Sequence, residues 1–282
     1  MTYEQSSLGR LIPSTDNSLS TVDNSTLRDA LLNLAAPVCI TNEGVCTGGM
    51  VSFDPQSTQG VPLNGLALPL PLERCGDVSF CATHGVRYPM VGGSMAKGIS
   101  SAAMVIELGR HGMLGFFGSA GLPIETVEAT INQLQEALPN GPFGVNLIHS
   151  PNEPDLENAL VDLYLKRNVH LVEASAFLAL SPAVVRYRLH GIHRDSQGNI
   201  VTPNRIIAKV SREEVARHFL SPPPEKMLEE LMAQNIITSE QAELARHIPM
   251  AEDITAEADS GGHTDNRPAL SLFPTICALR DT

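Results

Sequence analysis

From residue 88 onward, short apolar runs alternate with stretches in which apolar residues recur every three or four positions. A short continuous apolar run predicts a buried strand, and the wider spacing predicts a helix with one buried face. Repetition of this pair is typical of parallel strands joined by crossover helices. Six strands are predicted, at residues 88–91, 113–117, 143–148, 170–174, 205–210 and 253–258.

The connections between these strands differ in regularity. Residues 150–153 and 211–214 carry the Ser-x-x-Glu pattern of a helix capping box. A helical insertion is predicted at about 218–250, with a second helix starting at 238–241. The pattern leaves residues 184–188 in an irregular stretch.

The first 80 residues have a different texture. Residues 1 to about 28 are rich in Ser, Thr and Asn, which predicts a loose arm outside any core. The apolar residues at 37–40 and 45–46 flank a polar turn and predict a hairpin. We therefore expect an arm with a small appended domain in residues 1–80 and a larger α/β domain in residues 81–282.

Six strand-helix units are compatible with two fold classes. An open doubly wound sheet can end at six strands, whereas a (β/α)8 barrel closes at eight. In either class the loops at the carboxyl ends of the strands share one open face, so the chemistry is expected there.

Composition narrows the class of protein. With 43% apolar and 18% charged residues, the chain has the profile of a globular protein, and no apolar run reaches the roughly 18 residues that span a bilayer. The N-terminus lacks the basic and apolar regions of a signal peptide, which predicts a cytoplasmic location. A net charge of −12 argues against nucleic acid as a partner.

Five cysteines without a CxxC pair predict reduced thiols and no disulfide framework. Cys75, Cys81 and His84 lie near one another in sequence, but their spacing and the missing fourth ligand favour ordinary loop residues. No metal site is assigned.

Three strand ends carry unusual residues. Gly92, Gly93 and Ser94 allow a flat or anionic ligand to approach the backbone closely, although a plain tight turn is an alternative. Asn146 interrupts an apolar strand, where a hydrogen-bonding heterocycle or the neighbouring backbone could satisfy its amide. His263 follows two glycines at the end of the sixth strand, where it could transfer protons or simply lie in a surface loop.

Together, and in this order, three of these segments resemble the flavin barrel shared by nitronate monooxygenases and bacterial flavin-type enoyl reductases. They are Tyr-Pro-Met-Val-Gly-Gly-Ser-Met at 88–95, Phe-Gly-Val-Asn-Leu at 143–147 and Gly-Gly-His at 261–263. The residues at 118–123, 185–188 and 257–268, with the appended N-terminal segment, resemble more closely the PfaD family. That family consists of trans-acting enoyl reductases of polyunsaturated fatty acid and polyketide synthases.

The resemblance implies a TIM (β/α)8-type barrel that binds FMN. It places Gly92, Gly93, Ser94, Met95 and Asn146 along the flavin ring system. It also implies that Gly261 and Gly262 let the sixth loop pass close to FMN, and that His263 stands beside the substrate as general acid or base.

Lys209, at the end of the fifth predicted strand, is added on physical grounds. A cation near the pyrimidine edge of the flavin would stabilise the reduced anionic form. A structural ion pair with an acidic neighbour is the alternative.

The implied reaction transfers hydride from NAD(P)H through FMN to the β-carbon of an α,β-unsaturated thioester. The substrate would be carried by an acyl carrier protein, and the partners would be subunits of the synthase. Formation of a homodimer is a further possibility.

The sequence contains one basic cluster, which could receive an acidic carrier protein or could be solvated surface. It consists of Arg186, Arg188, His190, His193 and Arg194.

Relatives of this kind continue with two further strands that hold the FMN phosphate, so the chain is expected to be an incomplete barrel of about six units. Such a fragment is predicted to bind FMN poorly or to aggregate. Two other functions stay open: a nitronate monooxygenase-type flavin oxidase, and a non-catalytic fragment that docks on a synthase.

Overall fold

The computed structural model describes residues 8–12, 19, 23–54, 58–258 and 268–281. The chain divides into two compact units, Met1–Phe80 and Cys81–Thr282, each with its own buried residues. Within the described residues no helix is long and apolar enough to cross a membrane.

The N-terminal unit contains a five-stranded antiparallel sheet with the strand order β3-β2-β5-β1-β4. The predicted hairpin is confirmed, because Cys39 and Cys46 lie opposite each other on β2 and β3. The prediction of a loose arm outside the core is wrong for β1, whose Leu11 is fully buried. The elements are β1 (Gly9–Ile12), α1 (Asn24–Leu32), β2 (Val38–Thr41), β3 (Val45–Thr47), β4 (Met50–Ser52) and β5 (Val61–Ala67).

The C-terminal unit is built on a six-stranded sheet in which every pairing is parallel. Its strand order, β13-β12-β9-β8-β7-β6, follows the order of the chain without reversal. A doubly wound sheet reverses its order at a switch point, so the sheet is that of a (β/α)-barrel with six units present. The strands are β6 (Val91–Gly92), β7 (Leu114–Phe117), β8 (Gly144–Ile148), β9 (Leu171–Ser175), β12 (Arg205–Val210) and β13 (Asp253–Ala256).

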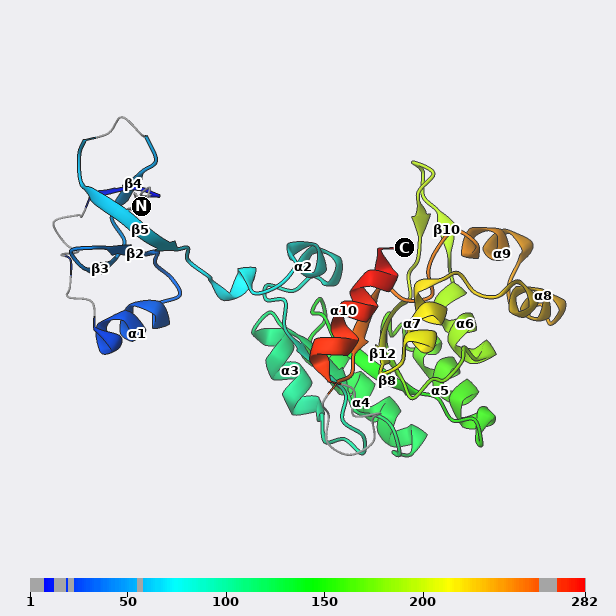
Figure 1. Cartoon of the computed structure of the whole chain (residues 1–282). Helices are drawn as coiled ribbons and strands as arrows, with labels where there is room; N and C mark the ends of the chain where they lie inside the picture. Colours follow the sequence, from blue (N-terminus) through cyan, green and yellow to red (C-terminus); the bar gives the residue numbers. More distant parts are fainter. Residues whose placement is uncertain (1–7, 13–18, 20–22, 55–57, 259–267, 282) are drawn as a thin grey trace. The chain divides into compact units, whose positions relative to one another are not determined.

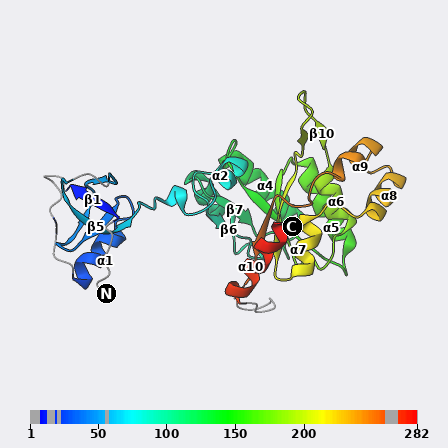
Figure 2. The ribbon, with the colours of Figure 1, turned by 45° about the horizontal axis from the view of Figure 1, so that its top comes forward.

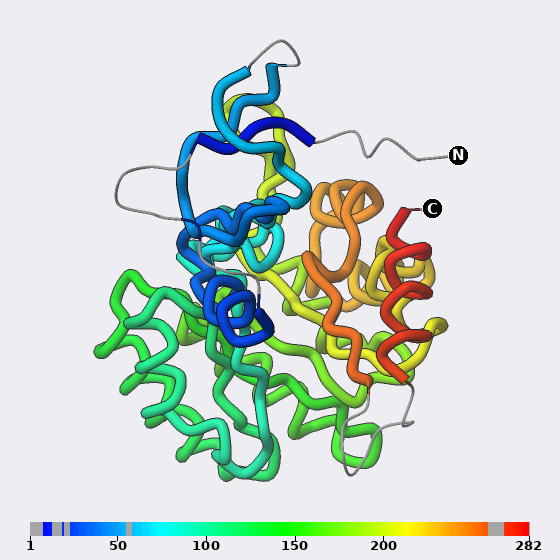
Figure 3. Tube along the Cα trace, turned by 60° about the vertical axis from the view of Figure 1, so that its left-hand side comes forward, coloured from blue at the N-terminus to red at the C-terminus, as the bar shows by residue number. Residues whose placement is uncertain are grey.

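The helices of this unit follow the strands in chain order and pack on one side of the sheet (Figures 1 and 3). Alternate strand residues, such as Val145, Leu147 and Val172, join the helices in one apolar core. Successive strand residues point to opposite faces, so the residues between them point away from this core. The helices are α3 (Ala102–Arg110), α4 (Ile124–Ala137), α5 (Pro154–Lys166), α6 (Pro182–Leu189), α7 (Glu213–Leu220), α8 (Glu225–Ala233), α9 (Ser239–Ala245) and α10 (Ala269–Arg280).

The remaining short elements precede the sheet or project from it. The 3-10 helix η1 (Leu72–Arg74) and α2 (Val78–His84) come before β6. The strands β10 (His193–Arg194) and β11 (Ile200–Val201) form a separate hairpin, which lies between β9 and β12 in the sequence but not in the sheet. The C-terminal helix α10 packs against α7 and β13 (Figure 2).

Several local predictions need correction. Residues 184–188 belong to helix α6, which starts with Pro182 and has Ser181 as its N-cap, so they are not irregular. The helix α5 begins at Pro154 with Glu153 as its N-cap and no side-chain cap, so the box predicted at 150–153 does not form. The helix α7 begins at Glu213 with Arg212 as its N-cap, one residue later than the predicted box places it. The predicted helical insertion is present as α8 and α9, and the capping box between Thr238 and Gln241 forms as expected.

Candidate functional site

The side of the sheet opposite the helices carries two buried polar residues next to each other. We call this side the inner face; Asn146 on β8 and Glu173 on β9 lie on it because their sequence neighbours pack into the helix-side core. The register pairs Asn146 with Glu173, and their exposed fractions are 3% and 1%. Burying a polar group costs free energy unless it forms hydrogen bonds, so the hydrogen-bond partners of this pair are informative.

The amide of Asn146 has a fixed orientation. Its Nδ2 atom donates to the backbone oxygen of Glu173 at 3.1 Å and to Oγ of Ser175 at 2.8 Å. Because a carbonyl oxygen can only accept, Nδ2 must be the atom that faces Glu173. No described residue donates to Oδ1 of Asn146, so an acceptor remains on the inner face for a ligand with an N–H or O–H group.

Asn204 shows what a purely structural buried asparagine looks like in this chain. Its Nδ2 donates to the backbone oxygens of Tyr187 and His190 at 3.0 and 3.1 Å. Its Oδ1 lies 3.2 Å from Nδ1 of His170. Both ends of this amide have protein partners, which distinguishes it from Asn146.

The backbone beneath Asn146 is held from the helix side. The hydroxyls of Ser119 and Tyr164 each donate to the carbonyl oxygen of Asn146 at 2.7 Å. Burial raises the pKa of Tyr164, which keeps its hydroxyl protonated and able to donate. These two bonds help to hold Asn146 in place before any ligand is present.

The loop after β6 turns back over the sheet and meets Glu173. The backbone N–H of Ser94 donates to Oε2 of Glu173 at 2.9 Å, and the Ser94 hydroxyl donates to the same oxygen. Ser100 shapes the loop, since its hydroxyl donates to the Gly93 oxygen at 2.8 Å and accepts from the Met95 N–H at 2.9 Å.

The two glycines of this loop have different surroundings. A side chain on Gly92 would collide with Leu108 of α3 at 2.4 Å, so the missing side chain of Gly92 serves packing against the helix. A side chain on Gly93 would instead approach Oε1 of Glu173 at 3.2 Å on the inner face. Gly93 is therefore the position at which a ligand can reach the backbone.

Lys209 of β12 also lies on the inner face, between Ala208 and Val210 of the helix-side core. Its Nζ atom lies 3.6 Å from Oε1 of Glu257, and both side chains are about one-fifth exposed. The structural ion pair that the sequence left open is thus formed. The pair places the ammonium group of Lys209 beside the carboxylate of Glu257 at the carboxyl end of the sheet.

The predicted site residues are only partly covered by the structure. It brings Ser94 and Asn146 together through Glu173, and it puts Gly93 and Lys209 on the same face. Met95 is half exposed in the same loop. Gly261, Gly262 and His263 lie outside the described residues, so their roles stay predictions.

Glu173 was not among the site residues predicted from the sequence. Its signal was the same as that of Asn146, a polar residue within an apolar strand. Ser119 and Tyr164 gave no such signal, because a hydroxyl on a loop and one on an amphipathic helix are ordinary before the fold is known.

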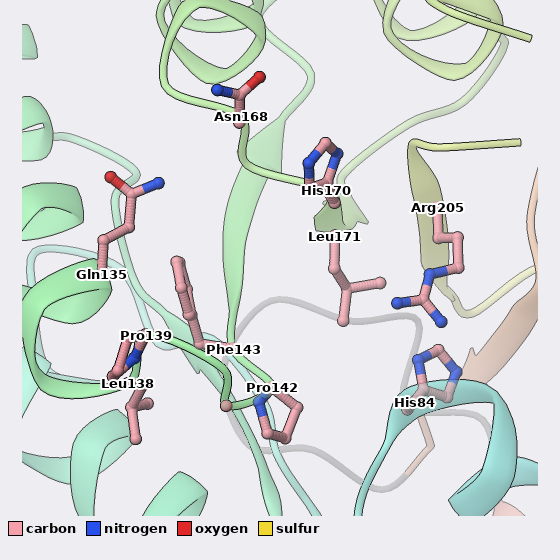
Figure 4. A pocket seen from close by; sticks show the side chains of 11 residues that line it. His84, Gln135, Leu138, Pro139, Pro142, Phe143, Asn168, His170, Leu171 and Arg205 are labelled. Carbon is pink, nitrogen blue, oxygen red and sulfur yellow. The ribbon is translucent and has the colours of Figure 1, made fainter.

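A separate pocket of about 350 Å³ opens at the amino ends of the strands, lined among others by His84, His170 and Arg205 (Figure 4). In barrels of this type the reactive groups gather at the carboxyl ends. His84 is bound to Asp253 at 2.7 Å and His170 to Asn204, so these side chains support the fold. We therefore place the candidate site on the inner face.

The predicted basic cluster is not a uniform surface. Arg188 is buried, where it donates to the backbone oxygens of Asn204 and Pro249 and lies 2.6 Å from Glu252. Arg186 is paired with Asp162 at 2.6 Å. The residues of this cluster therefore do not form one patch for a carrier protein, and Arg188 belongs to the core.

The comparisons with known proteins give a consistent result. One component of the polyunsaturated fatty acid synthase of Thraustochytrium sp. is 48% identical over 255 residues, which is 90% of this chain and 17% of that component. Another component of the same synthase is 46% identical over 276 residues, which is 98% of this chain and 13% of that component. The chain is a homologue of polyunsaturated fatty acid synthase components.

This homology extends to polyketide biosynthesis. Polyketide biosynthesis protein PksE of Bacillus subtilis is 47% identical over 210 residues, which is 74% of this chain and 27% of that protein. No family model matches the chain. The chain thus spans between 13% and 27% of the length of these three curated homologues.

A solved structure links the homologues to an activity class. The enoyl reductase domain of MlnA, from the macrolactin biosynthesis cluster of Bacillus amyloliquefaciens, aligns with a TM-score of 0.72 and 43% identity. The alignment covers 75% of this chain and 48% of that chain. The resemblance that the motifs predicted is confirmed by these homologues, and so is the barrel-type fold.

Proposed function

We propose that this chain forms the ring-binding part of an FMN-dependent enoyl reductase that acts in trans in polyunsaturated fatty acid or polyketide biosynthesis. The substrate would be an α,β-unsaturated thioester on an acyl carrier protein, and NAD(P)H would be the hydride donor. The observation that carries the proposal is the free acceptor Oδ1 of Asn146, held in a buried frame that Glu173 links to the loop at Gly93.

The described residues fit a flat heterocycle that carries an N–H group. Oδ1 of Asn146 can accept a hydrogen bond from such a group, and the missing side chain of Gly93 leaves room for a ring against the backbone. When bound, FMN supplies the redox chemistry between the nicotinamide and the enoyl group.

The protein's own groups then have three tasks. The frame of buried groups around Asn146 orients the ring. Lys209 supplies a positive charge, moderated by Glu257, that favours a reduced and more negative cofactor. His263 is proposed as the general acid that delivers a proton to the α-carbon of the thioester.

The homology to synthase components and to the MlnA enoyl reductase domain supports the substrate class. Phosphate sites of such barrels commonly follow the seventh and eighth strands, whereas the described sheet has six. We therefore expect measurable but modest affinity of this chain for FMN.

The test combines a binding and an activity measurement on the purified chain. FMN is titrated while its fluorescence is followed, and NADPH oxidation is then measured with crotonyl-coenzyme A and, separately, with nitroethane. We expect saturable quenching, and NADPH oxidation that depends on both FMN and the enoyl thioester. Turnover of nitroethane alone would indicate a nitronate monooxygenase, and the absence of saturable FMN binding would overturn the proposal.

A further inference from the structure

Glu173 joins parts of the fold that are distant in both sequence and strand order. Its carboxylate receives both hydrogen bonds from Ser94, which is 79 residues earlier in the chain. Ser94 follows β6, and β7 and β8 lie between β6 and β9 in the sheet. The contact therefore reaches across two intervening strands on the inner face.

The loop from Gly93 to Ser100 is also bonded to the neighbouring strand end. The N–H groups of Lys97 and Gly98 donate to the oxygens of Ala120 and Gly118 at 2.8 and 2.9 Å. A side chain on Gly118 would collide with the Met95 oxygen, so the loop lies directly on the end of β7. Glu173 adds a connection to β9, and this connection sets how far the loop reaches over the inner face.

The same residue also holds Asn146. The backbone oxygen of Glu173 accepts from Nδ2 of Asn146, while its side chain accepts from Ser94. Glu173 thus fixes the position of the Gly93 loop relative to the side-chain amide of Asn146.

The second carboxylate oxygen of Glu173 determines what kind of group fits beside Gly93. No described residue donates to Oε1, which lies 3.2 Å from the place of a side chain on Gly93. A phosphate offers only acceptors and negative charge, so it would meet an acceptor of the same sign there. A neutral ring with polar N–H groups has no such conflict, which argues against a phosphate site at this glycine loop.

We infer that Glu173 is a positioning residue that holds the Gly93–Ser100 loop over the inner face, so that the loop receives the ring of the cofactor and not its phosphate. This inference rests on the proposed function. It goes further by naming Glu173 as the residue that holds the loop in the place where it can receive the ring.

A matched pair elsewhere in the unit separates positioning from simple stabilisation. Glu157 of α5 is also buried, and the hydroxyl of Ser181 donates to its Oε1 while the Ser150 N–H donates to its Oε2 at 3.1 Å. This pair repeats the hydroxyl-to-carboxylate bond of Ser94 and Glu173 but is built on α5 and the start of α6, where the Ser181 hydroxyl also accepts from the Val184 N–H. Ser181→Ala is therefore the control for Ser94→Ala.

The experiment measures three quantities on the chain and on the variants E173Q, E173A, S94A and S181A. The first is the rate of hydrogen exchange of the Gly93–Ser100 amides without cofactor. The second is the Kd for FMN, measured in parallel with the Kd for inorganic phosphate. The third is the urea concentration at the midpoint of unfolding. We expect E173A and S94A to speed exchange in the loop and to weaken FMN binding about tenfold or more. E173Q retains an acceptor for the Ser94 N–H and is expected to fall between E173A and the unchanged chain.

The control and the outcomes distinguish the alternatives. S181A is expected to lower the urea midpoint while the loop exchange and the Kd for FMN stay unchanged. Equal losses of FMN affinity in S94A and S181A, or an unchanged Kd in E173A, would overturn the inference. Phosphate that binds with an affinity sensitive to E173A would also overturn it. If the unchanged chain binds no FMN, the proposed function fails by itself, while the exchange data still decide whether Glu173 holds the loop.

Discussion

Nε2 of His84 lies 2.7 Å from Oδ2 of Asp253. His84 ends α2, which precedes the first strand of the sheet in sequence, and Asp253 begins β13, the last strand. The backbone oxygen of Thr83 also accepts a hydrogen bond from Arg205 of β12. The carboxyl end of α2 is thus attached to β12 and β13 at the amino ends of these strands.

The first prediction concerns this attachment. His84→Ala removes a buried partner of Asp253 and is expected to lower the free energy of unfolding of the C-terminal unit by about 1–3 kcal/mol. Urea denaturation followed by circular dichroism measures the change. His111→Ala, at an exposed histidine, is the control and is expected to stay within about 0.5 kcal/mol. Equal effects of the two variants would contradict a structural role for the His84–Asp253 pair.

A second prediction contrasts two buried asparagines. Asn146→Ala is expected to weaken FMN binding about tenfold or more, because it removes the free acceptor of the inner face. Asn204→Ala leaves the carbonyls of Tyr187 and His190 without a donor, so it is expected to lower stability without changing the Kd for FMN. Fluorescence titration and urea unfolding of both variants give the comparison. An unaltered Kd in Asn146→Ala would count against the ring site.

A third prediction follows from the backbone next to Ser175. Ala176 has a φ of 61°, a conformation that costs an L-residue with a side chain about 1 kcal/mol or more. Ala176→Gly is therefore expected to stabilise the unit by about 0.5–1 kcal/mol in urea unfolding. Ala179→Gly, in the same loop but without a positive φ, is expected to give no gain. A gain of equal size there would show that backbone strain at Ala176 is not the cause.

The fourth prediction separates the two arginines of the basic cluster. Arg188→Ala leaves Glu252 without its ion-pair partner and two backbone carbonyls without a donor, and it is expected to cost about 3–5 kcal/mol. Arg186→Ala removes an ion pair with the largely exposed Asp162 and is expected to cost at most about 1 kcal/mol. Thermal and urea unfolding of the two variants measure the difference. Similar losses in both would mean that the burial of Arg188 has no energetic consequence.

The fifth prediction uses the cysteines of the N-terminal sheet. Burial raises the pKa of Cys39 and Cys46 above the ordinary value of 9.0. Because the pKa of each thiol is raised in the folded state, burial of the two neutral thiols contributes fully to the free energy of unfolding below pH 9. This contribution is lost as the pH rises through the raised pKa values. Alkylation by iodoacetamide at pH 8, followed by mass spectrometry, should modify the exposed Cys75 much faster than Cys39 or Cys46. Comparable rates for all three would contradict the burial.

Much of the C-terminal unit could be predicted from local pattern. The strand at 205–210 was predicted at its observed bounds, and the others within a few residues, because the strand residues that face the helix layer are apolar. The first strand is the exception, since only Val91 and Gly92 pair with β7. Its predicted start at residue 88 was too early, because the chain bends at residues 87–89 and the regular ladder begins at Val91.

The sequence by itself determined the alternation of strands and helices, the insertion that starts again at Thr238, and the motifs at 92–95 and 146, since each depends on residues close together in the chain. Only the tertiary structure decided that the strands lie in chain order, and that Glu173 meets Ser94 and Asn146 on one face. Those relationships depend on which strands become neighbours. Strand order is set by packing of the whole helix layer, and a hydrogen bond between residues 79 positions apart leaves no periodic trace in the sequence.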